Sequence, residues 1–581
     1  MFSVMNAGKR SIHVAKIVRR CQGKTYVSYL LRHSFRDGKH VRHKTLANLS
    51  HLPESLIHIV QRALKGEKFV ATSEAFRTTD ALPHGHVHAV LGTLRKLQLD
   101  TLIASEPSWQ RDLCLALIVE RVLFPASKLA SLRHWQATTL ASELALTEVT
   151  EKEVYQAMDW LLTRQSAIER KLAQRHLREQ APILYDVSSS FYYGRTCPLA
   201  RYGHDRDGKK GLPIIVYGLL TDGDGRPVAI QVYPGNTNDA TTVPGQVNKL
   251  RKRFHLQRLI LVGDRGMLTD TQIEKLRAYP GLRWISALRS TAIRALLDKG
   301  HLQRSLFDDA NLAELRSPDF PGERLIACHN PLLEEERRRK RRALLQKTEE
   351  ALQGLVAEVH RRTDTPLTAG VIGIKAGQHL KHWKMAKHFQ VTIGDGVFTW
   401  ARRPESIARE EELDGIYVIR TSATKRQLSA SDTVRHYKRL AQVEQGFRTL
   451  KGLDLLVRPI HHRVPPRVRA HFLLCMLSYY VEWELRRAWR PLLFADEELA
   501  TARNERDPVQ PAEASQSAQA KKKTKRNTAG EPVHSFRTLL AELARQTRNT
   551  HVITGIEGKG SFTQVVDANA LQAKAFALLG L

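Results

Sequence analysis

The sequence has few cysteines and no long apolar segment. The cysteines are Cys21, Cys114, Cys197, Cys328 and Cys475. They form no Cys-x-x-Cys pair and share no regular spacing, which argues against zinc ribbons and disulfide frameworks. The longest apolar segment, residues 471–483, is too short to span a bilayer, and the N-terminus lacks the apolar run of a signal peptide. We therefore expect reduced thiols in a cytoplasmic protein with no membrane partner.

Acidic residues are scarce relative to basic ones. The 91 Lys and Arg residues exceed the 59 Asp and Glu residues and give a formal net charge of +32. A surplus of this size points to a polyanionic partner, and nucleic acid is the first candidate. Charge alone does not separate DNA from RNA, or binding from catalysis.

The N-terminal part of the chain divides into two predicted regions. Its length of 581 residues suggests several folded units, at about 100–200 residues per domain. Residues 25–50 carry Asp37-Gly38 between two β-rich runs, which is a hairpin signal. We therefore expect a small basic β-containing module over residues 1–70. Residues 85–180 have apolar residues at three- and four-residue spacing, which predicts a helical region, and the net charge makes it a candidate for DNA binding.

Residues 181–290 change to the period of short strands. The predicted elements are three strands within 182–194, 212–222 and 227–236, a helix at about 240–254, a strand ending in Asp264, a helix near 270–279 and a strand at 283–288. Three strands in a meander, then a helix and further strands, make a mixed α/β sheet. An RNase H-like core has this order, with acidic residues on its first and fourth strands.

The remainder of the chain interrupts and then completes that core. Residues 291–430 are predicted to be an insertion domain, with a long helix over 332–362 and a hairpin over 389–403. We expect the long helix to be a solvated arm rather than a DNA contact. The last predicted parts are core completion over 431–495, a disordered linker over 496–535 and a short C-terminal tail over 536–581. The linker is predicted from its polar, Lys-rich composition, and its basic run at 520–526 is a candidate for nonspecific nucleic-acid contact.

Three acidic residues are candidates for a catalytic metal site: Asp186, Asp264 and Glu444. Asp186 follows the apolar residues of a core strand, and Asp264 closes another strand where Gly263 and Gly266 let the chain turn. Phosphodiester hydrolysis is well served by a pair of Mg²⁺ ions, which prefer carboxylate oxygens. Three carboxylates on separate elements therefore predict a divalent metal site for cutting nucleic acid.

The segment that carries Glu444 is predicted to be one amphipathic helix over residues 437–451. Its buried stripe is Leu440, Val443, Phe447 and Leu450, which leaves Glu444 at the edge of the stripe. Tyr437, Glu444 and Lys451 are each seven residues apart and are expected to project on one side, with Arg448 one turn from Glu444. This pattern suits a carboxylate that holds metal among groups that bind phosphate.

Each acid also has an ordinary structural interpretation. Asp264 could cap a turn, Asp186 could accept hydrogen bonds from the serine run that follows it, and Glu444 could be a solvated helix residue. The acids at 205, 207, 222 and 224 lie in Gly-containing turns and are interpreted as turn residues, while Asp239 is a possible neighbour of the site. His461 and His462 lie among Arg and Pro residues and are interpreted as DNA-facing or structural.

These segments resemble the DDE transposases of bacterial insertion sequences, in the branch (insertion-sequence family four) with a Tyr-x2-Arg-x3-Glu-x6-Lys signature. Tyr437, Glu444 and Lys451 match that spacing, whereas the Arg position holds Leu440, with Arg439 beside it. Arg439 or Arg448 could supply the missing charge. The segments YDVSSSFYYG, YPGNTND and VEQGFRTLKGLDLLVRPIHHR are similar to the same family, and the similarity runs from the N-terminus to about residue 490.

The resemblance implies an RNase H-like core split by an insertion, and an N-terminal portion that recognises terminal inverted repeats. It also implies Mg²⁺, for which Mn²⁺ can substitute, held by the three acids. Strand hydrolysis at the element end would be followed by attack of the released 3′-OH on DNA, without a covalent enzyme intermediate. Assembly into a homodimer or larger complex on double-stranded DNA is expected, in a cytoplasmic, nucleoid-associated protein.

Two other functions compete with an active transposase. One is a transposase-derived DNA-binding protein that no longer cuts, and the other is a nuclease that stops at cleavage. The presence of all three acids opposes the first, and the size of the helical region and insertion opposes the second. Leu440 in the signature Arg position favours impaired function.

Overall fold

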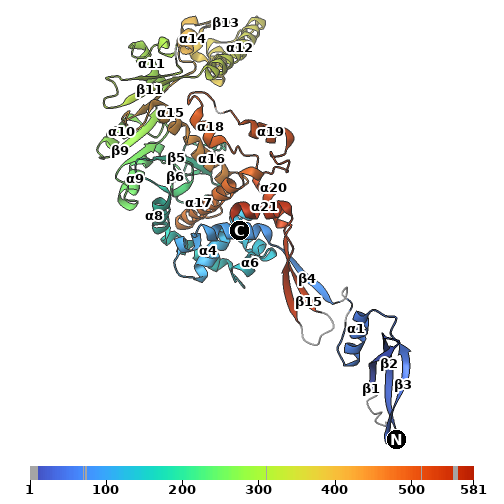
Figure 1. The fold of residues 1–581 in the computed structure, drawn as a ribbon. Coiled ribbons are helices and arrows are strands. Elements are labelled where there is room, and N and C mark those ends of the chain that lie inside the picture. The colour runs from blue at the N-terminus through green and yellow to red at the C-terminus, as the bar shows by residue number, and fades with distance from the viewer. Residues whose placement is uncertain (1–10, 70, 72–74, 309, 512, 554–559) are drawn as a thin grey trace. The chain divides into compact units, whose positions relative to one another are not determined.

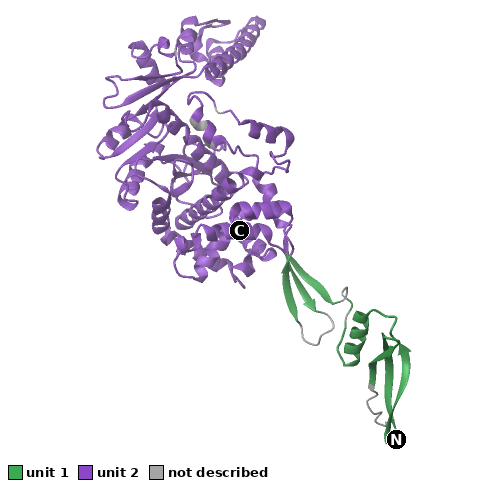
Figure 2. Cartoon of the chain, viewed as in Figure 1, with its two compact units in different colours: residues 1–81, 548–565 green, residues 82–547, 566–581 purple. Residues whose placement is uncertain are grey.

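The structure is a computed structural model that describes residues 11–69, 71, 75–308, 310–511, 513–553 and 560–581 (Figure 1). Contact clustering divides the chain into two compact units (Figure 2). The first comprises residues up to Ala81 together with Arg548–Val565, and the second comprises the rest. Residues 1–10 of the predicted N-terminal module, and 554–559 of the predicted tail, lie outside the described residues.

The first unit contains two small antiparallel sheets. One sheet has the order β1-β2-β3, with β1 (Ser11–Cys21), β2 (Lys24–Asp37), β3 (His40–Asn48) and the following helix α1 (Glu54–Leu64). The hairpin predicted at Asp37-Gly38 is present, and Gly38 has the positive φ of +63° that this tight turn needs. The other sheet has the order β16-β15-β4, with β4 (Phe76–Pro83), β15 (Thr547–Ile553) and β16 (Ser561–Val565). The chain therefore returns from its C-terminal part to pair with a strand near its start.

The second unit begins with a helical layer. Its helices are α2 (Gly85–Lys96), α3 (Leu99–Ile103), α4 (Trp109–Leu123), α5 (Lys128–His134), α6 (Leu140–Glu143), α7 (Glu151–Thr163) and α8 (Gln165–His176). Local sequence sets several helix starts, as at α7, where Thr150 and Glu153 form a capping box. The apolar faces of α2, α4 and α7 belong to the main hydrophobic core. The helical character predicted for residues 85–180 is thus present.

An eight-stranded sheet, of order β10-β11-β14-β9-β8-β5-β6-β7, forms the centre of the second unit. The first strands are β5 (Pro182–Phe191), β6 (Ile214–Thr221) and β7 (Pro227–Pro234), which form an antiparallel meander. After α9 (Asp239–Asn248) and the π-helical turn η3 (Lys249–Arg253), β8 (Leu259–Val262) pairs parallel to β5. After α10 (Asp270–Arg277), β9 (Leu282–Ala287) pairs parallel to β8. The predicted RNase H-like mixed sheet is confirmed.

The insertion is smaller than predicted. Within residues 291–430, three strands extend the central sheet: β10 (Leu312–Leu315), β11 (Arg324–His329) and β14 (Ile416–Thr421). Strand β14 pairs antiparallel with β9, where Ile419 lies opposite Ala287. The prediction that this whole range interrupts the sheet is therefore wrong. These strands are short and their partners are distant in sequence, so local periodicity does not reveal the pairing.

A separate lobe remains between β11 and β14. It contains α12 (Pro331–Arg361), α13 (Ala369–His382), β12 (Phe389–Gly394), β13 (Val397–Arg402) and α14 (Pro404–Glu411). The predicted long helix and hairpin correspond to α12 and the β12–β13 pair. This lobe has its own apolar core, in which Leu345, Leu352 and Leu355 of α12 pack with Ile372 and Phe398. The heptad-like leucines therefore bury against the lobe itself.

Three helices complete the core beside the sheet. They are α15 (Ala430–Lys438), α16 (Leu440–Lys451) and α17 (Pro465–Ala488). Most of α17 is buried, and it packs against α4, α7 and β7. Even so, none of the described helices is both long enough and apolar enough to cross a membrane.

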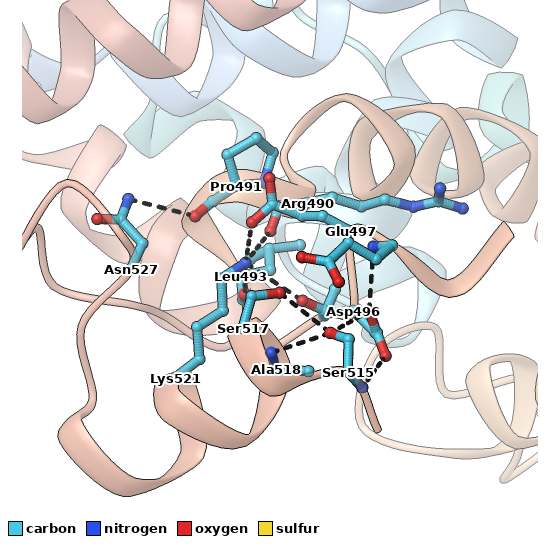
Figure 3. A network of polar contacts seen from close by, with 12 residues as sticks. Arg490, Pro491, Leu493, Asp496, Glu497, Ser515, Ser517, Ala518, Lys521 and Asn527 are labelled. Atoms are coloured by element: carbon cyan, nitrogen blue, oxygen red, sulfur yellow. Dashed lines mark hydrogen bonds and ion pairs between the residues drawn. The ribbon is translucent and has the colours of Figure 1, made fainter. Parts of the chain in front are cut away.

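The described residues of the segment predicted to be a disordered linker, 496–511 and 513–535, include helices and turns, which corrects the prediction for this range. It contains α18 (Leu499–Glu505) and α19 (Gln516–Thr524), and it leads to α20 (Phe536–Ala544) and α21 (Ala570–Leu579). Lys521 of the basic run is only 2% exposed. Its ammonium group donates to the carbonyls of Arg490 and Ala495, at 3.0 and 3.2 Å, and pairs with Glu497 at 2.5 Å (Figure 3). Hydrogen bonds to carbonyl groups from outside the basic run therefore help to hold this segment, which has few large apolar residues.

Candidate active site

Asp186 and Asp264 lie at the same level on neighbouring strands. Strands β5 and β8 pair in parallel, and the last of their recorded pairs is Leu184 opposite Val262. Continuing this register by two residues places Asp186 opposite Asp264, which follows β8 directly after Gly263. Neighbouring strands are about 4.8 Å apart, and residues two apart face the same side of a sheet. The topology therefore brings the two residues near each other, and the charge of Asp264 acts on Asp186.

The environment of Asp186 disfavours its charged form. Burial raises its pKa to about 7, and the negative charges of Asp264 and Glu444 contribute in the same direction. A hydrogen bond from the backbone N–H of Val187, at 2.7 Å, and the charge of Arg206 oppose that rise. Since both other acids act on Asp186, the three predicted acids form one electrostatic cluster.

Asp264 caps the loop that follows β8. Its Oδ1 atom accepts hydrogen bonds from the backbone N–H groups of Gly266, at 3.1 Å, and Met267, at 2.7 Å. Asp264 therefore does cap a turn, as its ordinary structural interpretation predicted. It is compatible with a catalytic role, because these bonds fix the carboxylate beside the end of the strand and both end on a single oxygen.

Glu444 projects from α16 away from the buried side of that helix. The predicted apolar stripe is present, since Leu440, Val443, Phe447 and Leu450 are all buried. The side chain of Glu444 is 57% exposed and lies 3.6 Å from the guanidinium of Arg448. Among the described residues, no three His, Cys, Asp or Glu side chains lie close enough together to hold a metal ion. The structure thus brings Glu444 within electrostatic reach of the two aspartates without closing the three into one ligand set.

Tyr437 faces the same acids from a separate helix. The single helix predicted over 437–451 is wrong, because α15 ends at Lys438 and α16 begins at Leu440, with Arg439 as the residue between them. Burial raises the pKa of the Tyr437 hydroxyl to about 12, and the charges of Asp264, Glu444 and Asp186 contribute to the rise. The hydroxyl therefore lies near all three carboxylates despite the break in the helix.

The other predicted phosphate-binding residues have protein partners. The side chain of Lys451 is 12% exposed, and its ammonium group pairs with Asp207 at 3.0 Å. Arg439 donates to the carbonyl of Gly223 at 3.3 Å and lies 3.5 Å from the carboxylate of Asp224. Both acids were interpreted as turn residues, yet each receives a cation from the α16 region. Leu440, in the signature Arg position, is buried in the core.

Asp207 and Arg206 are two residues that sequence reasoning missed. The carboxylate of Asp207 is nearly fully buried and pairs with both Lys451 and Arg458. Arg206 pairs with Asp239, and its charge acts on Asp186. The adjacent charged residues at 205–207 could have indicated a role at the site. The same residues before a glycine are, however, equally typical of a turn. Only the three-dimensional pairing separates the two interpretations.

A basic cleft adjoins the acidic cluster. One cavity of about 960 Å³ is lined by basic residues that include Arg265, Arg337 and Lys340. A second cavity, of about 260 Å³, shares Arg265 and Arg337 and is also lined by Tyr437. Because Arg265 follows Asp264 directly, the cations lead from the acids to helix α12. That helix was predicted to be only a solvated arm, whereas its first half contributes to this cleft.

Known protein families match much of the chain. The family model described as a transposase DDE domain matches residues 188–481, and the model described as the IS1634 family transposase N-terminal domain matches residues 14–75. The first match includes Asp264 and Glu444 and begins two residues after Asp186. No curated protein matches the chain. The assignment to insertion-sequence family four is supported by neither match and stays a prediction.

Among solved structures, the chain is similar to a piggyBac transposase synaptic complex with hairpin DNA. The identity is 9% and the TM-score is 0.33, and the similarity covers 79% of this chain and 76% of that chain. The DDE domain match itself spans just over half of the sequence, and an insertion-sequence transposase domain is matched before it. This chain therefore belongs to the DDE transposases of bacterial insertion sequences.

Proposed function

We propose that this transposase cuts and joins DNA strands at the ends of its element, with Asp186, Asp264 and Glu444 as its catalytic and metal-binding residues. The observation that carries the proposal is that Asp186 lies on β5 and Asp264 follows the adjacent parallel strand β8, with the charge of Asp264 acting on Asp186. The charges of Asp264 and Glu444 both act on Asp186, so the third acid belongs to the same cluster. These acids come from three distant segments, and solvation alone gives no reason for them to converge.

The acidic cluster fits a divalent cation by its donor chemistry. Carboxylates are the hard oxygen donors that such a cation prefers, and the pKa of Asp186 is raised to about 7, mainly by burial and further by the charges of Asp264 and Glu444. Mg²⁺ is the proposed ion, with Mn²⁺ able to substitute. Bound metal would activate the attacking oxygen and stabilise the leaving oxygen. Glu444 is exposed and has Arg448 as its ion-pair partner, so its side chain can turn toward the aspartates.

The residues around the acids are proposed to hold the DNA backbone. Tyr437 and Arg448 lie beside the acidic cluster, and the cleft that includes Arg265 continues the positive charge toward α12. Arg439 and Lys451 can contact phosphate only by leaving Asp224 and Asp207. We therefore propose that Lys451 positions the loop that carries Arg206 through its ion pair with Asp207. It would contact DNA only when that ion pair opens.

The raised pKa of Asp186 bears on how the site would bind metal. Below about pH 7 its carboxyl group tends to hold a proton, and this proton must leave before the oxygens can act as ligands. Strand hydrolysis is proposed to release a 3′-OH at the element end, which then attacks target DNA or the opposite strand. Tyr437 remains protonated throughout, because its pKa is raised to about 12. Its hydroxyl can therefore donate a hydrogen bond to a phosphate oxygen.

The proposed partners are the terminal inverted repeats of the element and target DNA. The N-terminal module and the helical region are proposed to bind the repeats, and two element ends call for a homodimer or larger assembly on double-stranded DNA. The net charge of +32 favours association with the nucleoid in the cytoplasm. Phosphate contacts would supply most of the affinity, so binding should weaken steeply with salt.

The test is cleavage of duplexes that carry the DNA flanking the gene, in Mg²⁺ or Mn²⁺. Asp264→Asn should lose cleavage by more than about a hundredfold while it retains DNA binding, because even partners of metal ligands typically contribute 10–100-fold. The control variant is Asp364→Asn, which changes an exposed loop carboxylate to the same amide. Unchanged cleavage by Asp264→Asn would falsify the site.

The same assay separates the competing functions. Cleavage without joining of the released 3′ end would identify a nuclease. DNA binding without cleavage by the wild-type chain would identify an impaired transposase. The buried Leu440 motivates this second comparison, because the signature places an Arg there.

A further inference from the structure

A buried basic pocket lies in the second unit, on residues other than the three acids. Its volume is about 190 Å³. The lining comes from the end of α4, the start of α5, α7, the segment after α16, and α17. The basic residues that line it are Arg121, Lys128, Arg458, His461, His462 and His471.

Two of these cations are buried without an anion beside them. The side chains of Arg121 and Lys128 are only 3% and 4% exposed. Among the described residues, neither the guanidinium of Arg121 nor the ammonium of Lys128 forms a recorded hydrogen bond or ion pair. Burial of an unpaired charge is strongly unfavourable in the absence of a partner. Both side chains line the pocket, so a ligand inside it can reach them.

Two imidazoles lie beside these basic groups and are held in their neutral form. His462 and His471 are both buried, and their rings lie 5.2 Å apart. Burial lowers the pKa of His462 to about 3, and the charge of Lys128 is the next largest cause. Burial also holds the pKa of Lys128 well below its usual range, assisted by the charge of Arg121. Each of these groups therefore weakens the protonation of the next, as expected for clustered bases that lack an anion.

Three acids of this region already have partners, one of which, Arg458, itself lines the pocket. Glu120 pairs with His134 at 2.7 Å, Asp159 pairs with Arg467 at 3.4 Å, and Asp207 pairs with Arg458 at 2.5 Å. None of these three carboxylates lines the pocket. Glu120 does act on Arg121, but its own pKa is raised by burial, so it compensates that charge poorly. Arg121 and Lys128, unlike Arg458, are thus left without an ion-pair partner and are available to a ligand.

We propose that this pocket binds a phosphate group. A volume of about 190 Å³ accommodates a tetrahedral oxyanion with some water, since one water occupies about 30 Å³ of liquid. The ammonium of Lys128 and the forked guanidinium of Arg121 supply the charge-assisted donors that phosphate oxygens accept. The phosphate can come from the DNA backbone or from inorganic phosphate in solution. The DNA source rests on the proposed function, whereas the binding chemistry does not.

The first experiment is thermal unfolding of the full chain in inorganic phosphate and in chloride at equal ionic strength. Wild-type protein should unfold at a higher temperature in phosphate, because the ligand binds only the folded state. Lys128→Met should be more stable than wild type in chloride, since it removes a buried charge, and should lose most of the phosphate response. The control is Lys152→Met, which changes an exposed lysine on α7. It separates pocket binding from the general stabilisation that phosphate gives to proteins.

Equal phosphate responses in wild type, Lys128→Met and Lys152→Met would overturn the proposal. So would a Lys128→Met protein that is less stable than wild type in chloride yet still responds fully to phosphate. If Lys128→Met fails to fold, Arg121→Met gives the same comparison from the other side of the pocket.

The second experiment identifies the source of the phosphate. Binding of the full chain to a DNA duplex is measured over a range of salt concentrations, with and without inorganic phosphate. If the pocket holds a DNA phosphate, Lys128→Met should reduce the slope of log affinity against log salt by about 1, and phosphate should compete with DNA. An unchanged slope together with a pocket-dependent phosphate response assigns the site to free phosphate. Loss of DNA cleavage in every assay would leave the first experiment intact, so the two proposals fail separately.

Discussion

Replacing Asp186 with Asn should stabilise the protein when metal is absent. The folded state raises the pKa of this carboxyl group from 3.8 to about 7, mainly through burial. Between these values the folded protein holds a proton that the unfolded chain has released. The free energy of unfolding therefore falls as the pH rises from about 4 to about 7. Asn carries no charge, and its side-chain oxygen can still accept the hydrogen bond from Val187.

The size of the effect follows from the pKa difference. At 1.36 kcal/mol for each pKa unit, the difference corresponds to about 2 kcal/mol at about pH 5 and about 4 kcal/mol at about pH 8. Asp186→Asn should thus gain more stability over wild type at the higher pH, and it should lose the stabilisation that Mg²⁺ gives to wild type.

The assay is urea unfolding of both proteins in EDTA at the two pH values. Asp239→Asn is the matched control, because Asp239 is a nearby aspartate that pairs with Arg206 and whose loss should destabilise the fold. The reasoning is refuted if Asp186→Asn is no more stable than wild type at the higher pH. It is also refuted if the difference between the two proteins does not change with pH.

Three further substitutions test the elements that surround the site. Asp207→Asn should destabilise the fold by about 3–5 kcal/mol in urea unfolding, because it leaves the partly buried Lys451 and Arg458 without their shared, buried anion. An unchanged stability would show that these pairs are not needed. Gly446→Val should lower the free energy of unfolding by about 1–3 kcal/mol in the same assay, because a Cβ added there would lie 3.1 Å from the ring of Tyr479. An unchanged urea midpoint would contradict that packing. Lys521→Met should increase protease cleavage within residues 496–535, because it removes the hydrogen bonds and the ion pair of Lys521 that hold this segment. Equal cleavage of the variant and wild type would show that these bonds do not hold the segment.

The local part of the fold could be predicted from the sequence. Short apolar runs predicted the strand that contains Asp186 and the strand that Asp264 follows, because a buried strand is recognisable from a few consecutive residues. The helical spacing of Val443, Phe447 and Leu450 gave the buried side of α16 and left Glu444 outside it. These features depend on neighbouring residues only, so the candidate acids could be placed on their elements.

The parts that were missed depend on contacts between distant residues. Strand β14 joins the central sheet by pairing with β9, which is more than a hundred residues earlier in the chain. Lys521 is held by hydrogen bonds to carbonyl groups of residues 490–495, and the composition of its own segment, which has few large apolar residues, does not reveal these bonds. The chain between Tyr437 and Glu444 contains no Pro or Gly, so the helix break at Arg439 has no local signal. Pairing and packing of this kind become visible only in three dimensions.

The central claim is that Asp186, Asp264 and Glu444 form one metal site. The most direct measurement replaces Mg²⁺ with Fe²⁺ in the DNA-bound protein, adds ascorbate and peroxide, and maps where hydroxyl radicals cut the polypeptide. We predict cuts close to residues 186, 264 and 444 together, all suppressed by excess Mg²⁺ and by Asp186→Asn. Cuts near only one of these segments, or cuts that persist in Asp186→Asn, would contradict the account.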